Sequence, residues 1–117
     1  MKRSREKRPP GWQPSITKMT EMIEEATVDA HDEGEQATGW QCAFDEHLEL
    51  PFITRVLGVE VKVEQIDLRD DNSIVALCTR GRERQAISLI DLPLPKPPPT
   101  GSEWIAAYKY FCTGTRA

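Results

Sequence analysis

The residues of this sequence with the clearest chemical potential are carboxylates gathered in one stretch of the chain. Ten acidic residues fall between positions 21 and 49, and that stretch contains no Lys or Arg. They are Glu21, Glu24, Glu25, Asp29, Asp32, Glu33, Glu35, Asp45, Glu46 and Glu49. Oxygen ligands in flexible geometry suit Ca²⁺, and a bound cation would relieve the repulsion between neighbouring like charges. The composition of this stretch therefore fits a hard divalent cation.

A second hypothesis stays open, in which the chain is a small SH3-like protein-interaction module whose acidic face docks on a basic partner protein. The two hypotheses differ in what they predict for mutants. Replacing Asp29, Asp32 and Glu35 by Asn abolishes ion binding under the first, whereas charge reversal over the whole face is needed under the second.

An EF-hand loop is the best-known calcium motif to test against the sequence. Placing Gly34 at the sixth position of that loop puts Asp29 first and Glu33 fifth. His31 then falls third and Trp40 twelfth, where an oxygen ligand and a bidentate Glu are required. No EF-hand is present here, so a calcium site must have another architecture.

Two helices are expected to carry the acidic stretch. Apolar residues at steps of three and four predict a helix over residues 16–31, with Ser15 as its N-cap. Its predicted core face consists of Ile16, Met19, Ile23, Ala26 and Ala30. Beyond Gly34, a second helical stripe runs from Ala37 through Trp40 and Phe44 to Leu48 and stops at Pro51. The acidic groups would collect around the bend of this helical hairpin.

Beyond Pro51 the apolar period changes from that of a helix to that of a strand. Val59, Val61 and Val63 alternate with charged residues, as in a half-buried strand. Further strands are predicted at Phe52–Leu57, Ile74–Thr79 and Gln85–Leu89. Leu92–Pro99 is expected to be an extended, proline-rich connector, and Ser102–Phe111 a final helix.

These elements predict an α+β fold, in which the helical hairpin packs on a small antiparallel sheet or SH3-like barrel. At 117 residues, with 38% hydrophobic and 29% charged, the chain suits one compact domain. We assign residues 15–112 to that domain, residues 1–14 to a flexible basic arm and residues 113–117 to a tail. The arm is read as a solvated segment, and we do not expect nucleic acid as a partner.

The cysteines bear on compartment and on chemistry. Cys42, Cys78 and Cys112 form no C-x-x-C pair, and an odd number favours a reducing compartment, so we expect a cytoplasmic protein. No stretch has the length or apolarity of a membrane span or a signal peptide. Nothing pairs a nucleophile with an orienting base, and no phosphate loop is present, so we expect no catalysis.

Several short motifs occur together in a distinctive order. The residues in question are Val28–Ala37, Gly39-Trp40, Asp45-Glu46, Leu50-Pro51-Phe52, Val59–Val63, Arg80-Gly81-Arg82, Ile87-Ser88-Leu89, Trp104 and Tyr108. In these residues the chain resembles the cyanobacterial-type calcium-binding proteins called CcbP-like, from about Ile23 to Phe111. The resemblance implies a bacterial calcium-binding protein that acts outside any EF-hand in Ca²⁺ buffering or signalling.

The resemblance also implies ligands, carried over position by position. The first candidates are Asp29, Asp32, Glu33 and Glu35, and the second candidates are Asp45 and Glu46. The chain departs from the family pattern at His31, where an aromatic residue is expected, and this departure predicts a weaker affinity for calcium.

Overall fold

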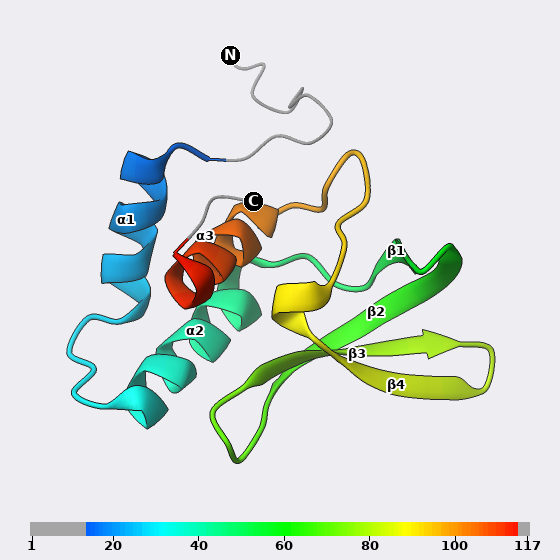
Figure 1. The fold of residues 1–117 in the computed structure, drawn as a ribbon, viewed down its shortest axis with the longest axis horizontal. Coiled ribbons are helices and arrows are strands. Elements are labelled where there is room, and N and C mark those ends of the chain that lie inside the picture. Colours follow the sequence, from blue (N-terminus) through cyan, green and yellow to red (C-terminus); the bar gives the residue numbers. More distant parts are fainter. Residues whose placement is uncertain (1–13, 115–117) are drawn as a thin grey trace.

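The computed structural model describes residues 14–114 and confirms the predicted α+β fold. Its elements follow one another as helices, then strands, then a last helix (Figure 1). They are α1 (Ile16–Ala26), α2 (Glu33–His47), β1 (Phe52–Val56), β2 (Val59–Leu68), β3 (Ile74–Arg80), β4 (Glu83–Ser88), the 3-10 turn η2 (Leu89–Asp91) and α3 (Ser102–Thr113). Each predicted helix and strand therefore has a counterpart in the structure.

The four strands form an antiparallel meander in the order β1-β2-β3-β4. In the described residues β1 pairs only with β2, and β4 only with β3, so the sheet is open and does not close into a barrel. A bulge between Val63 and Gln65 shifts the register of β2 against β3, and such bulges bend a strand and increase its twist. The structure thus realises the small curled sheet rather than the closed form.

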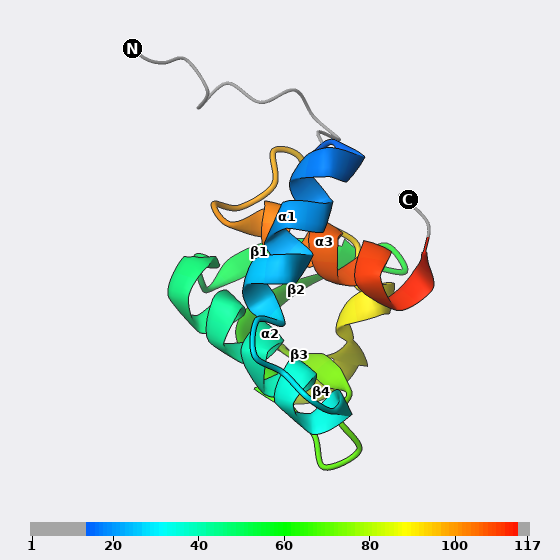
Figure 2. The same cartoon turned by 90° about the vertical axis from the view of Figure 1, so that its left-hand side faces the viewer.

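The helices cover one face of this sheet, and the opposite face is left without a helix (Figures 1 and 2). α2 lies against β2, while α1 packs on α3 and on α2. The side-chain amide of Gln41 fastens α2 to the sheet, because its Nε2 donates to the carbonyl oxygen of Ile66 at 2.9 Å. The acidic hairpin is therefore held in a fixed position relative to the strands.

An aromatic cluster forms the centre of the core between α2 and α3. Trp40 is 0% exposed, which confirms its assignment to the core, and its ring lies 5.3 Å from that of Tyr108 and 6.1 Å from that of Phe44. At the other end of α2, His47 stacks on Trp104 with ring centroids 4.6 Å apart. These contacts fix the second half of α2, from Trp40 to His47, against α3.

The predicted core face of α1 was partly wrong. The helix ends at Ala26 instead of residue 31, so Ala30 lies outside it. At this end the Thr27 hydroxyl donates a hydrogen bond to the carbonyl oxygen of Ile23. Met19, Met22 and Ala26 are its buried residues, whereas Ile16 is 48% exposed. The helix faces α3 as well as α2, and this second partner selects a different set of apolar side chains.

Two glycines allow backbone segments to meet where a side chain would not fit. A Cβ at Gly39 would lie 2.0 Å from the carbonyl oxygen of Ala26, so the end of α1 sits directly on α2. A Cβ at Gly101 would lie 2.1 Å from the carbonyl oxygen of His47, and Gly101 also has a φ of +87°. The segment that enters α3 is thereby packed against the end of α2.

Leu92–Pro99 contains neither helix nor strand, as predicted for the connector. Of the predicted basic arm only Pro14, which is buried, belongs to the described residues, and the last three residues of the predicted tail lie outside them. No helix within residues 14–114 is long and apolar enough to cross a membrane.

Candidate metal centre

The bend between α1 and α2 is shaped by local hydrogen bonds and by one residue in the left-handed region. The Ala30 amide donates to the carbonyl oxygen of Thr27 at 3.0 Å, which closes a turn after α1. Asp29 has a φ of +63°, a conformation that Asp adopts more readily than most residues. This turn redirects the chain into α2.

Asp32 and Glu35 together cap the start of α2. Asp32 is the N-cap, and its Oδ1 accepts a hydrogen bond from the Glu35 amide at 2.8 Å. Glu35 reaches back, since its Oε1 accepts from the backbone amide of His31. This reciprocal arrangement is related to a capping box, and the helix dipole stabilises both negative charges. Each carboxylate keeps its second oxygen free of these contacts.

The turn between β2 and β3 approaches the same place from the sheet. Asp71 shapes this turn, because its Oδ1 accepts from the Ser73 hydroxyl at 2.6 Å and from the Ser73 amide at 3.0 Å. These hydrogen bonds, the hydroxyl bond most, hold the pKa of the Asp71 carboxyl below its usual value of 3.8. The next residue, Asn72, has a φ of +70° and points its side chain toward α2.

Asp32 and Asn72 meet beside Gly34, in the first turn of α2. A Cβ on Gly34 would lie 3.4 Å from Oδ1 of Asp32 and 3.7 Å from Oδ1 of Asn72. The missing side chain therefore leaves room between two oxygens that come from a helix cap and from a strand turn. The sequence offered one signal for Asn72, an oxygen-bearing side chain in the polar run Asp70–Ser73 just before the predicted strand Ile74–Thr79, but gave no indication that this segment reaches α2.

An open hollow surrounds this meeting point. Its oxygen-bearing lining includes Asp29, Asp32, Glu35 and Asn72, and Leu68 and Ala26 lie on its apolar side. No Cys or His is among the described residues that line it. An oxygen-only donor set suits Ca²⁺ and does not suit zinc or other soft metals, so the chemistry of the residues fits the ion that the sequence suggests.

The six predicted ligands are not gathered at one point. Glu33 lies in the first turn of α2 but does not line the hollow. Asp45 is twelve residues further along α2, about 18 Å away at 1.5 Å per residue, where its Oδ1 accepts from Gln41 Nε2. In Glu46, the next residue, Oε1 lies 3.7 Å from Nε2 of His47. Asp45 and Glu46 therefore cannot share an ion with Asp32 and Glu35.

The described part of the chain contains no group of three or more His, Cys, Asp or Glu side chains placed to hold a metal ion. The hollow by the bend brings three carboxylates and an amide to one rim, but they serve as caps and turn residues in this conformation. In addition, the positive end of the α2 dipole opposes a cation, so the carboxylates have to supply the attraction. Their side chains would have to move to converge on an ion.

The geometry so far defines an α+β protein with an open, oxygen-lined hollow beside the bend of its helical hairpin. A family model described as calcium binding, that of the CcbP type, matches residues 20–112. The chain belongs to this calcium-binding family. It is not a known family of enzymes.

Two solved structures share the fold. The crystal structure of CcbP from Anabaena is similar with a TM-score of 0.65 and 21% identity, over 89% of this chain and 97% of that one. A calcium binding protein in its calcium-binding form has a TM-score of 0.65 and 21% identity, over 86% of this chain and 94% of that one. Among curated proteins, none matches the sequence.

Proposed function

We propose that this protein binds Ca²⁺ at the hollow between the α1–α2 bend and the β2–β3 turn, through Asp29, Asp32, Glu35 and Asn72. The observation that carries the proposal is the approach of Asp32 and Asn72 to the space beside Gly34. Two elements far apart in the sequence supply oxygens to one open rim, and the rim faces solvent. Membership of a calcium-binding family supports the choice of ion.

The chain's own residues would share the work in a defined way. In Asp32 and Glu35, one carboxylate oxygen accepts a hydrogen bond from a backbone amide, which fixes the orientation of the side chain. The other oxygen is left for an ion. Asn72 would add a neutral oxygen, and the left-handed turn that holds it is fastened by Asp71. A bound Ca²⁺ would supply positive charge that offsets the repulsion between the carboxylates of the bend.

The affinity we expect is moderate, because the helix dipole opposes the cation and the ligands must shift to reach it. A moderate, fast-exchanging site fits buffering. Sensing would require that the ion alters a contact elsewhere in the molecule. We further propose that the protein works in the cytoplasm and catalyses nothing; its free thiols Cys42, Cys78 and Cys112 support a reducing compartment.

Calorimetry on the full chain tests the site directly. Asp32→Asn and Glu35→Gln keep the size of each side chain and remove its charge, and Asn72→Gly removes the amide while tolerating the positive φ. Each should weaken Ca²⁺ binding by roughly tenfold or more. The double variant D45N/E46Q is the matched control, since it removes two charges from the same helix outside the hollow.

The control also decides between the two groups of predicted ligands. Unchanged binding in D45N/E46Q together with loss in D32N supports the hollow. Loss in D45N/E46Q with normal binding in D32N would move the site to the other end of α2 and overturn the proposed location. Absent or only millimolar binding by the unmodified chain would overturn the function itself.

A further inference from the structure

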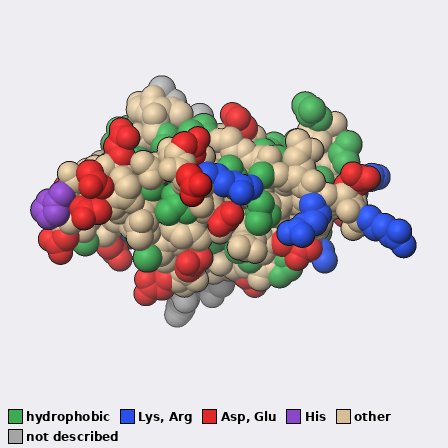
Figure 3. All heavy atoms as spheres, turned by 90° about the horizontal axis from the view of Figure 1, so that it is seen from below, with side chains coloured by type: hydrophobic (Ala, Val, Ile, Leu, Met, Phe, Trp, Pro, Cys, Tyr) green, Lys and Arg blue, Asp and Glu red, His purple; other side chains and the backbone are tan. Residues whose placement is uncertain are grey.

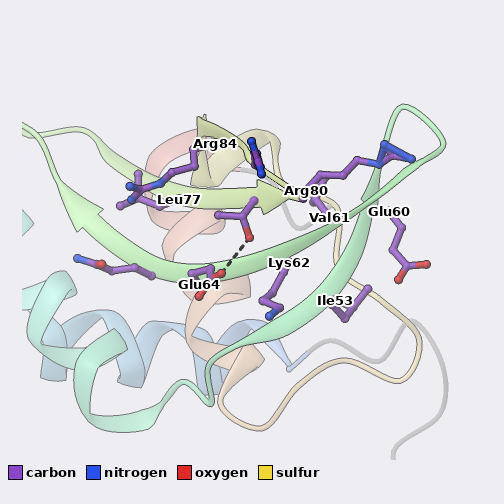
Figure 4. Close-up of a pocket in the computed structure, with 12 residues that line it drawn as sticks. Ile53, Glu60, Val61, Lys62, Glu64, Leu77, Arg80 and Arg84 are labelled. Carbon is purple, nitrogen blue, oxygen red and sulfur yellow. Dashed lines mark hydrogen bonds between the residues drawn. The ribbon is translucent and has the colours of Figure 1, made fainter.

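The sheet face that the helices leave open carries a hollow of its own (Figure 4). Ile53, Lys62, Thr79 and Arg84 are cross-strand partners in β1, β2, β3 and β4, so they form one row across that face. Ile53 is 44% exposed and Leu77 is half-buried beside this row. The floor of the hollow is therefore only partly apolar, because Lys62 and Thr79 stand between Ile53 and Leu77.

Positive charge surrounds this floor. Lys62 and Arg84 belong to the row, Arg80 ends β3, and Arg82 lies in the turn between β3 and β4. All four are exposed, and within residues 14–114 none of them forms an ion pair. Glu64 lies on the same face, but its Oε2 accepts from the Thr79 hydroxyl at 2.9 Å. The face is thus a basic surface whose cations are available to a partner.

The opposite end of the molecule has the complementary character. Figure 3 shows carboxylates crowded at one end and most of the visible Lys and Arg side chains toward the other. In the α1–α2 bend, Val28 is 68% exposed and is followed closely by Asp29, Asp32 and Glu33. An exposed apolar side chain bordered by carboxylates is the chemistry that a partly apolar floor with a basic rim would accept.

We propose that the basic sheet face docks the acidic α1–α2 bend of a second copy of this chain. The arginines would pair with carboxylates of the bend, for which the guanidinium fork is well suited, and Val28 would lie on the exposed side chain of Ile53. Since the two surfaces lie on different parts of the molecule, the contact is heterologous. Copies would add head to tail into open chains or a ring.

A polyanionic nucleic acid fits this face less well. Single strands are held by aromatic side chains on which bases stack, and none of the described residues lining the hollow is aromatic. Glu60 and Glu64 stand on the same surface and would repel a phosphate backbone. A partner with separate carboxylates around an apolar contact can avoid these two glutamates.

Docking would be sensitive to calcium, because the bend that enters the basic face also carries Asp29, Asp32 and Glu35. Ca²⁺ on these groups would cancel the charge that attracts the arginines, so the ion should release the second copy. This coupling rests on the proposed calcium site. The docking itself does not, since it follows from the charge and shape of the two surfaces.

Sedimentation velocity of the full chain over a concentration series at low salt provides the test. We expect a concentration-dependent increase in mass that is lost at high salt, where surface charges are screened. The face variant R82E/R84E and the bend variant V28K/E33K should each be monomeric. K18E, a charge reversal on exposed α1 away from both surfaces, is the control and should associate as the unmodified chain does.

Mixing the two variants gives the decisive result. The bend variant keeps an intact face and the face variant keeps an intact bend, so a mixture should form a one-to-one dimer that cannot grow. Thermal unfolding of each variant verifies that it is folded. A mixture that stays monomeric, or a face variant that still associates, would overturn the docking. So would an unmodified chain that stays monomeric while its face binds a glutamate-rich peptide or a DNA oligonucleotide.

Calcium separates this proposal from the proposed function. R82E/R84E leaves the whole bend unchanged, so it should bind Ca²⁺ by calorimetry while failing to associate. If Ca²⁺, and not an equal concentration of Mg²⁺, dissociates the unmodified chain, the coupling is supported. Association with no Ca²⁺ binding would overturn the calcium site and the coupling and leave the docking supported.

Discussion

The backbone amide of Glu35 donates a hydrogen bond to Oδ1 of Asp32 at 2.8 Å, so a carboxylate proposed to hold calcium also begins α2. These two roles can be separated by mutation. Asn caps a helix about as well as Asp, whereas Ala at an N-cap costs about 1 kcal/mol of stability. We predict that Asp32→Ala lowers the free energy of unfolding by about that amount and that Asp32→Asn leaves it nearly unchanged.

Urea denaturation with and without Ca²⁺ measures both roles in one experiment. A ligand that binds only the folded state raises stability, so Ca²⁺ should move the midpoint of the unmodified chain upward. In Asp32→Asn the apo midpoint should stay in place and the calcium-dependent increase should shrink. An Asn variant that retained the full increase would show that the charge of Asp32 does not contribute to the site.

Much of the fold could be predicted from the sequence because its local signals agree with one another. The alternation around Val61, the helical stripe through Trp40 and the stop at Pro51 each reflect short-range patterns that tertiary packing reinforced. The end of α1 could not be predicted in this way. Its apolar spacing continues to Ala30, but Asp29 adopts a left-handed φ that ends the pattern.

The candidate site was harder to predict, since it depends on contacts between distant segments. Local composition identified Asp32 and Glu35, but Asn72 joins them only because the β2–β3 turn reaches the first turn of α2. Asp45 and Glu46 belong to the same acidic stretch of the sequence, yet the rise of the helix places them far from Asp32 and Glu35. The pattern of charge along the sequence shows neither the approach of Asn72 to α2 nor the separation of Asp45 and Glu46 from the bend.

The close approach of α1 and α2 at Gly39 leads to a strong effect on stability. Overpacking a core costs roughly 1–3 kcal/mol of stability. A backbone oxygen moves away less easily than a side chain, so the loss in free energy of unfolding for Gly39→Ala should be at or above the upper end of that range. The expected collision is with the carbonyl oxygen of Ala26, 2.0 Å from the added Cβ. Thermal and urea unfolding measure the loss.

Gly34→Ala is the matched control for Gly39→Ala, since both residues lie in α2. Its Cβ would come no nearer than 3.4 Å to Asp32, an ordinary van der Waals contact. Stability should therefore change by less than about 1 kcal/mol, with helix propensity favouring Ala. Equal losses in the two variants would mean that the interhelical contact is not the cause.

The turn that presents Asn72 should weaken in acid. Hydrogen bonds from Ser73 lower the pKa of Asp71 below 3.8 in the folded protein, so the carboxylate form is favoured by folding. The resulting stabilisation is present above 3.8 and is lost as the pH falls below that value through the lower folded pKa. Asp71→Asn removes this titration, so the urea midpoints of the variant and the unmodified chain should differ at neutral pH and converge in acid. A difference that did not depend on pH would contradict the assignment.

The three thiols should react with iodoacetamide at different rates in the folded protein. Cys42 and Cys112 are exposed residues and Cys78 is buried, but the thiol of Cys112 lies beside Tyr108. Burial raises the pKa values of Cys78 and Cys112 above 9.0, and only the thiolate attacks the reagent, so both should be slow at pH 8. We predict that Cys42 reacts fastest, Cys112 more slowly and Cys78 slowest, with the Cys112 rate rising most steeply at alkaline pH.

Peptide mass spectrometry over time gives the three rates, and the same reaction in urea, where all three should become similar, is the control. A Cys112 that reacted as fast as Cys42 at pH 8 would contradict the burial of its thiol beside Tyr108.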